Sequence, residues 1–243
     1  MRRCLFLLPL LVALIGLCPA RSADKDAPEG FEALFNGKDL TGWKVNKGGN
    51  MKVWGADKGI LYVEGGGGGW LMTEKEYDDF ELRLEFKLPE KGNSGVALRS
   101  RMEGNPAFEA GMEIQLLDDI WHRINYQDLK VSQLTGSIYD IQGPSKDALK
   151  PIGEWNKMRI VAKGGQITIE LNGEKIVDAN LDKYKNKNKS HPGMLHDKGH
   201  LGLQSHDGRV EFRNLYVKPL KGQPRSCHLS MVIGHSLVRS RAC

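Results

Sequence analysis

The segment 111–117 alternates apolar and polar side chains, so that an extended chain would separate them onto two faces. Its apolar residues point to one side, whereas Glu113 and Gln115 point to the other. The same alternation in three other segments places further polar residues on an outward face: Asn93 and Arg99 in 93–99, Gln204 and His206 in 201–206, and Arg213 in 209–217. If these faces share one concave sheet, their side chains converge on one groove beside several glycines. Such a groove suits a sugar ring, which needs many hydrogen bonds and close approach.

Histidines crowd the last third of the chain and raise the question of a metal site. His191, His196, His200 and His206 occur there, with Asp197 and Asp207 among them. Imidazole and carboxylate groups can together hold a divalent ion that acts as a Lewis acid. No two of these residues have the spacing of a compact ligand motif, so a divalent ion stays a possible cofactor without assigned ligands.

The elements that must position these side chains are strands. The segment 80–88 alternates apolar and charged residues without a fault. Segments 158–162 and 167–171 flank a Lys-Gly-Gly-Gln turn, and Asn172 with Gly173 provides the positive φ angles of a second tight hairpin. Further strands are expected at 60–64, 95–101, 111–117, 201–205 and 209–217, and short helical turns near 74–78 and 182–186. Many short strands without long helical periodicity predict an all-β, antiparallel β-sandwich or jelly roll.

The two ends of the chain differ from its middle. Arg2 and Arg3 precede an apolar run that is too short to span a bilayer comfortably, and small residues follow up to Ala23. We therefore predict a signal peptide over 1–23, cleaved near Ala23, a secreted or periplasmic protein, and no stable membrane anchor. Strand patterns stop after Leu220, so 24–220 is predicted as one domain and 221–243 as a disordered extension.

Charge and cysteine content exclude several classes of function. The net charge is +5, but removing the three arginines of 1–23 and the four basic residues of 221–243 leaves −2 for 24–220. Such a body lacks the basic face of a nucleic-acid binder, so no nucleic acid is expected as partner. It also contains no cysteine, which excludes a thiol nucleophile and a disulfide framework.

Eight stretches, in order over about 31–220, carry a resemblance to a known family. They are FEALFNGKDLTGW (31–43), GNSGVALR (92–99), GMEIQLLD (111–118), TGSIY (135–139), GEWN (153–156), LNG (171–173), GHLGLQSH (199–206) and FRN (212–214). Together they resemble the 3-keto-disaccharide hydrolase domain family. The resemblance implies a concanavalin-like jelly roll, similar to laminin-G sandwiches, and activity on 3-keto-glycosides. One departure is Ser205, which stands where family members often carry Asp.

The chemistry of a 3-keto-glycoside assigns roles to the candidate residues. The ketone acidifies the C2 hydrogen, so a base can remove it, the enolate can expel the C1 substituent, and water addition then completes a net hydrolysis. In this hypothesis Glu113 or His206 is the base, Arg99 or Arg213 stabilises the enolate, and Tyr139 protonates the leaving oxygen. Substrate binding is assigned to Asn93, Arg99, Gln115 and Gln204.

Two other functions remain open on the sequence. One is a non-catalytic carbohydrate-binding module, because laminin-G-like sandwiches share the strand–Asn-Gly–strand pattern. The other is a conventional glycoside hydrolase, which needs two carboxylates about 5 Å apart in its retaining form. Gln115, not an acid, is the same-face neighbour of Glu113, which disfavours that pair, although Glu211 could supply the second carboxylate from another strand.

Overall fold

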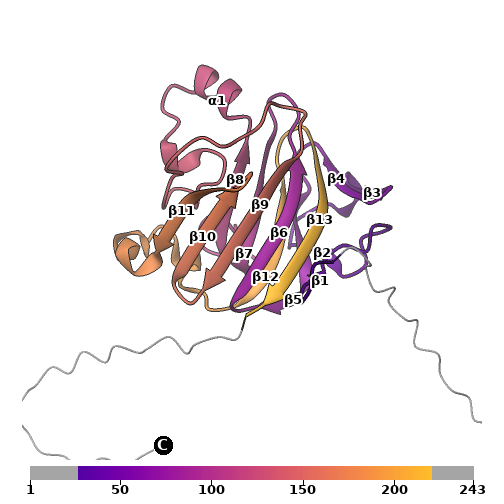
Figure 1. Ribbon diagram of the computed structural model, residues 1–243, viewed down its shortest axis with the longest axis horizontal. Helices are drawn as coiled ribbons and strands as arrows, with labels where there is room; N and C mark the ends of the chain where they lie inside the picture. Colours follow the sequence, from indigo (N-terminus) through magenta and orange to yellow (C-terminus); the bar gives the residue numbers. More distant parts are fainter. Residues whose placement is uncertain (1–26, 221–243) are drawn as a thin grey trace, which may run out of the picture.

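Two antiparallel sheets pack face to face in the computed structural model, which describes residues 27–220 (Figure 1). The eight-stranded sheet has the order β11-β10-β9-β6-β13-β4-β3, and β1 also pairs with β13. Its strands are β1 (Glu32–Ala33), β3 (Trp54–Asp57), β4 (Ile60–Glu64), β6 (Phe80–Lys87), β9 (Asn156–Lys163), β10 (Gln166–Leu171), β11 (Glu174–Asn180) and β13 (Arg209–Pro219). The predicted all-β, antiparallel sandwich is confirmed.

The five-stranded sheet has the order β2-β5-β12-β7-β8. Its strands are β2 (Trp43–Val45), β5 (Gly69–Tyr77), β7 (Asn93–Ser100), β8 (Met112–Leu117) and β12 (Gly199–Ser205). Helical segments are short: α1 (Asp119–Asn125) and the 3-10 turns η1 (Met51–Val53), η2 (Val131–Gln133), η3 (Leu181–Lys187) and η4 (Pro192–Leu195). The three strands β7, β8 and β12 carry most of the polar residues that the sequence singled out.

The core lies between the sheets and follows the alternation of the sequence. Along β6 the apolar residues Phe80, Leu82, Leu84 and Phe86 are all buried, while the charged residues between them face solvent. The predicted hairpins join β9 to β10 and β10 to β11. Asn172 and Gly173 have φ angles of 54° and 89°, as the second tight turn requires.

One predicted element is wrong, and several elements were not predicted, among them β1, β2, β3 and α1. The expected helical turn near 74–78 belongs mostly to β5, where Met72 and Glu76 are four positions apart while their partners on β12 are two positions apart. This bulge breaks the alternation that would have identified a strand. The expected turn at 182–186 lies within η3, whereas α1 has no counterpart among the predictions.

The long connection from β8 to β9 (118–155) carries α1 and η2 and then returns along the free edge of β8. Tyr139 N donates to Glu113 O at 2.9 Å, and Gln115 N donates to Ser137 O at 3.1 Å. Ile138 pairs with Ile114 in an isolated antiparallel bridge. The returning segment therefore behaves as a short extra strand beside β8, with Tyr139 as the neighbour of Glu113.

No helix within residues 27–220 is long and apolar enough to cross a membrane. The predicted signal peptide, its cleavage near Ala23 and the C-terminal extension 221–243 all lie outside the described residues. The secreted or periplasmic location accordingly remains a prediction.

Candidate active site

A small polar cavity of about 170 Å³ lies over the outer face of β7, β8 and β12. It is lined by Asn93, Asn105, Ala107, Phe108, Glu113, Gln115, Tyr139, Gln204 and His206. Six of the eight residues predicted from the sequence therefore meet in one place. Two predicted residues, Arg99 and Arg213, do not line it.

Glu113 is the carboxylate of this cavity, and its environment is unusual. Its exposed fraction is 3%, and no hydrogen bond or ion pair of its carboxyl group occurs within residues 27–220. Burial raises the pKa of the Glu113 carboxyl to about 8, because the protein interior disfavours its charged form. A buried carboxyl with a pKa near neutrality, placed in a cavity, has the properties of a general acid or base.

Gly95 on the neighbouring strand makes room for that carboxyl. A Cβ atom at this position would overlap the Glu113 side chain. The glycine is therefore required by close approach across the β7–β8 pair, and any larger residue would displace the Glu113 carboxyl.

Tyr139 stands beside Glu113 because the returning segment pairs with β8. Its hydroxyl oxygen accepts a hydrogen bond from Gln133 Nε2 at 3.2 Å, which leaves the O–H available as a donor. Burial, with a further contribution from Asp140, raises the pKa of Tyr139 above its ordinary value. The phenol therefore keeps its proton at neutral pH and can donate it.

Three amide side chains supply further polar groups. Gln115 Oε1 accepts from Leu116 N at 3.2 Å, so its NH₂ group is available to donate. The oxygens Asn93 Oδ1 and Gln204 Oε1 are buried without a hydrogen-bond partner within residues 27–220. Buried acceptors of this kind cost free energy unless a donor satisfies them, and sugar hydroxyls are such donors.

His206 occupies the rim of the cavity rather than its floor. Its Nδ1 lies 2.6 Å from Asp207 Oδ2, and both side chains are more than half exposed. The imidazole is thus oriented by a carboxylate at the entrance. The preceding Ser205 faces away from the cavity and holds the run of five glycines at 65–69. Its hydroxyl accepts from Gly68 N and donates to Gly65 O.

The expectation that Arg99 faces the groove is wrong. A bulge between β7 and β12 gives β7 one extra residue, and Arg99 adopts a φ angle of 48° there. Its guanidinium is fully buried and bonds Asp79 Oδ1 at 2.9 Å, together with the backbone carbonyls of Asp78 and Gly164. Arg99 therefore links the turn before β6 to the turn after β9.

The expectation that Arg213 joins this groove is also wrong. Arg213 belongs to β13 of the other sheet, where it pairs with Glu85 at 2.7 Å and stacks 4.0 Å from the Trp155 ring. Glu211, considered as a second carboxylate, lies on the same strand and pairs with Lys87 and Arg209. Strand alternation defines the two faces of a sheet, but it does not say which sheet a strand joins.

The histidines of the last third do not meet. His191 contacts Ser190 and the Phe108 ring, His196 contacts Arg101, His200 lies near Glu76, and His206 pairs with Asp207. Within residues 27–220 no group of three or more His, Cys, Asp and Glu side chains is arranged to hold a metal ion. The structure therefore assigns no ligands to the divalent ion considered from the sequence.

A second cavity of about 240 Å³ adjoins the first. Its lining includes four residues of the first cavity, Asn93, Gln115, Tyr139 and His206, and adds Leu117, His122, Tyr126, Leu129, Gln133 and Asp207. Residues of the loops, among them Asn105, Phe108, His122 and Tyr126, were missed by sequence reasoning. Loops lack the periodicity that reveals which strand residues share a face. The aromatic residues within these two otherwise polar loops were the one signal that could have pointed to the site.

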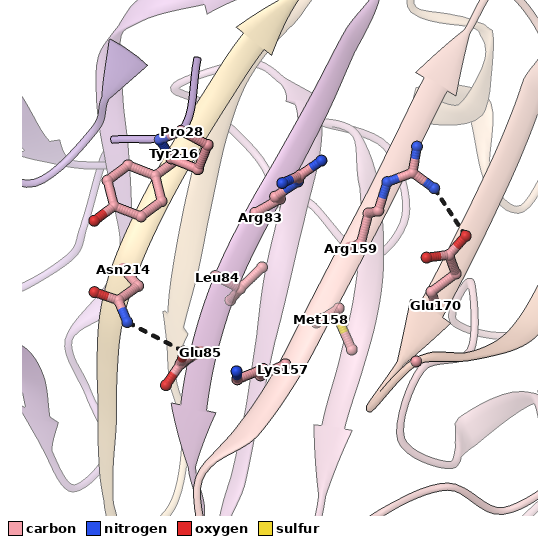
Figure 2. A pocket seen from close by; sticks show the side chains of 11 residues that line it. Pro28, Arg83, Leu84, Glu85, Lys157, Met158, Arg159, Glu170, Asn214 and Tyr216 are labelled. Carbon is pink, nitrogen blue, oxygen red and sulfur yellow. Dashed lines mark hydrogen bonds and ion pairs between the residues drawn. The ribbon is translucent and has the colours of Figure 1, made fainter. Parts of the chain in front are cut away.

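A larger groove of about 630 Å³ lies on the outer face of the eight-stranded sheet (Figure 2). Its carboxylates are all paired: Arg159 bonds Glu170 at 2.8 Å and also pairs with Glu81 nearby, while Asn214 donates to Glu85. Hydrogen bonding from Arg159 lowers the pKa of Glu81, so that carboxylate stays ionised and is a poor base at neutral pH. Among the described residues, each carboxylate that lines this groove is paired, so despite its size the groove offers no free carboxyl group.

The fold and the site together define the class of antiparallel β-sandwich domains that carry a small polar cavity on the outer face of one sheet. The family of 3-keto-alpha-glucoside-1,2-lyase-like domains matches residues 30–218, within the predicted 24–220 domain. The chain belongs to this family, as its resemblance to the 3-keto-disaccharide hydrolase domains predicted.

Individual relatives agree with this assignment. A 3-keto-disaccharide hydrolase from Bacteroides thetaiotaomicron is 27% identical, over 79% of this chain and 79% of the relative. Two crystal structures from Parabacteroides distasonis, provisionally described as glycosyl hydrolases, are each 30% identical. The alignment with the first has a TM-score of 0.70 and covers 79% of this chain and 95% of that structure's chain. The alignment with the second has a TM-score of 0.68 and covers 78% of this chain and 99% of that structure's chain.

Proposed function

We propose that this protein is a carbohydrate-active enzyme that hydrolyses 3-keto-glycosides by elimination and hydration. The observation that carries the proposal is Glu113, a buried, unpaired carboxyl with a raised pKa in a cavity of otherwise neutral polar groups. An ordinary glycoside offers no acidic C–H bond, whereas a ketone at C3 acidifies the hydrogen at C2. A base with a pKa of about 8 suits the removal of such a hydrogen.

In the first half of the reaction, the Glu113 carboxylate takes the C2 proton and the electrons of the C–H bond form an enolate. The oxygen at C3 then carries negative charge, and the Gln115 NH₂ group, which lines the cavity, is the donor for it. The enolate expels the C1 substituent as the C1–O bond breaks. Tyr139 gives its proton to the leaving oxygen, which departs as an alcohol.

In the second half, water adds across the new C1–C2 double bond. The Tyr139 phenolate takes one proton from water, hydroxide forms the bond to C1, and the protonated Glu113 returns its proton to C2. Both residues regain their starting states. The sum is one 3-keto-glycoside and one water converted to one 3-keto sugar and one alcohol.

His206 is the other candidate base, because it borders the same cavity and is oriented by Asp207. Its exposed position at the entrance favours Glu113 as the base and gives His206 a role in binding. Separate Glu113→Gln and His206→Gln variants distinguish the two. Full activity of both variants would exclude each of them as the base.

The conventional two-carboxylate mechanism finds less support. Among the described residues, Glu113 is the one carboxylate that lines the first cavity, and Glu211 belongs to the opposite sheet. A non-catalytic carbohydrate-binding module would have no use for a buried carboxyl held without a partner, at a cost in folding free energy.

The test is to incubate the purified protein with a 3-keto-disaccharide and with its unoxidised parent, with and without a chelator, and to follow the released sugar. Cleavage of the keto form alone is the expected result. Cleavage of the parent would support the two-carboxylate mechanism instead. Binding of either sugar without cleavage would indicate a binding module, and loss of activity with the chelator would show that a metal takes part.

A further inference from the structure

The second cavity adjoins the first, and the two share Asn93, Gln115, Tyr139 and His206 in their walls. Volumes of about 170 and 240 Å³ are each below the range of ~300–1,000 Å³ that is usual for small-molecule sites. Taken together they fall within it. The site is therefore a groove of two compartments, of which only one contains Glu113.

Tyr139 marks the border between the compartments. Its ring lines both, and its hydroxyl accepts from Gln133, which belongs to the second compartment. In the proposed reaction Tyr139 protonates the leaving oxygen, so the C1–O bond must lie at this border. The keto sugar then occupies the Glu113 compartment, and the group released from C1 extends into the second.

The wall of the second compartment is aromatic. The rings of His122 and Tyr126 stack with centroids 5.6 Å apart and an interplanar angle of 19°, and Trp121 packs edge-on against both. Tyr126 is 54% exposed, so part of it is available to a ligand. Aromatic walls favour ligands with a flat apolar face, such as the C–H face of a pyranose or an aryl ring.

This wall is held in place by two acidic residues at the start of the loop. Asp118 accepts from Trp121 N at 3.1 Å and from Lys91 N at 2.9 Å. Asp119 accepts from Thr135 N at 2.9 Å, which ties α1 to the far end of the loop. The compartment is thus formed before a ligand enters.

We propose that the second compartment is a leaving-group subsite, in which Tyr126 and His122 select glycosides whose released group contains a ring. This inference rests on the proposed function and adds to it two specificity-determining residues, which favour disaccharides and aryl glycosides over simple alkyl glycosides. Tyr126 acts through binding and takes no part in the chemical steps.

The test compares Tyr126→Ala with wild type on three substrates that share one 3-keto-glucosyl unit and carry a methyl, a phenyl or a second glucosyl group. The ratio of variant to wild-type kcat/KM for each substrate cancels the intrinsic reactivity of its leaving group. We expect about a 5- to 10-fold loss for the two ring-bearing substrates, mainly in KM, and less than a twofold change for the methyl glycoside. A loss with one ring type alone identifies whether the subsite is built for a sugar or an aryl group.

Two further variants separate binding from folding. Tyr126→Phe keeps the ring and should keep the preference, whereas Ile124→Ala changes an exposed residue of the same helix outside the compartment and should change nothing. Equal losses on all three substrates, or no loss on any, would overturn the inference. If wild type cleaves none of them, the proposed function fails instead. In that case saturation-transfer NMR with the phenyl glycoside still tests the subsite. The subsite predicts magnetisation transfer to the phenyl ring with wild type and none with Tyr126→Ala.

Discussion

The two outer faces of the sandwich both carry acidic residues, but these residues differ in burial and in pairing. On the eight-stranded sheet, Glu81 and Glu85 are partly exposed and bonded to arginines, and the groove on that face, which Glu85 lines, is the larger of the two sites (Figure 2). On the five-stranded sheet, Glu113 is buried beneath loops without a partner, in a cavity of about 170 Å³.

The comparison teaches that the state of the charged groups indicates reactivity better than the size of the groove. Paired carboxylates on an open sheet stay ionised, and their ion pairs mainly hold neighbouring side chains of a solvated surface in place. An unpaired buried carboxyl has its pKa raised toward the working pH, which is the requirement for proton transfer. Variants on the two faces should therefore affect different properties.

The largest effect is expected from Glu113→Gln. The amide has nearly the same shape but cannot take up a proton, so kcat on a 3-keto-disaccharide should fall by about 10²–10⁴-fold while substrate binding persists. The measurement is steady-state kinetics beside a binding titration. Glu85→Gln on the other face serves as the control and should retain wild-type kcat; a similar loss in both variants would contradict the contrast between the faces.

Gly95→Ala should have the next largest effect, because its new methyl group overlaps the Glu113 carboxyl and must move it. A displacement of about 1 Å can reduce the rate about 10²-fold, so kcat should fall with little change in KM. Gly165→Ala, whose new methyl group would make only an ordinary contact with Asn180 Oδ1 at 3.9 Å, is the matched control. Circular dichroism should show an intact fold in both; wild-type kcat for Gly95→Ala would show that the position of Glu113 is not critical.

The pH dependence of activity should reflect Glu113. With a pKa of about 8, the carboxylate form rises roughly tenfold per pH unit below that value, so kcat/KM should rise with pH and level off above about 8. An optimum near pH 5 would contradict this assignment.

The same pKa predicts the opposite trend for stability. Because the pKa of Glu113 is raised in the folded state, the unfolded state ionises first, and its contribution to the free energy of unfolding decreases between about pH 4.5 and 8. Glu113→Gln lacks this penalty, so its thermal midpoint relative to wild type should rise as the pH increases across that window. A pH-independent difference would show that the carboxyl is not held neutral.

The smallest effect is expected from Arg159→Ala on the open face. It removes ion pairs with Glu81 and Glu170, but the guanidinium is about one-third exposed, so the free energy of unfolding should fall by only about 1 kcal/mol or less. Turnover of the keto sugar should not change. A large loss of activity would mean that the open groove takes part in function.

Much of the site could be predicted from the sequence because strand alternation is a local property. The pattern of 111–117 placed Glu113 and Gln115 on one face, and that of 201–206 did so for Gln204 and His206. The cavity that these residues share with Asn93 and Tyr139 confirms that grouping. Burial of the opposite face determines this alternation residue by residue, so neighbouring residues alone reveal it.

The arginines could not be placed in this way. Arg99 leaves the outward face because a bulge shifts the register of β7 against β12. Arg213 lies on the eight-stranded sheet, not on the sheet of the cavity, because β13 pairs with β4 and β6. The aromatic wall of His122 and Tyr126 depends on a loop that folds back along β8. Each of these features is set by contacts between segments far apart in the chain.

The sequence by itself determined the β-sandwich class, the family and the side of each strand on which a polar residue lies, because these follow from local alternation and from motifs read in order. The tertiary structure alone decided which sheet each strand joins and which polar residues meet. It also decided that Glu113 is buried without a partner. A carboxyl group acquires its pKa from its surroundings, and those surroundings exist only once distant strands and loops have packed around it.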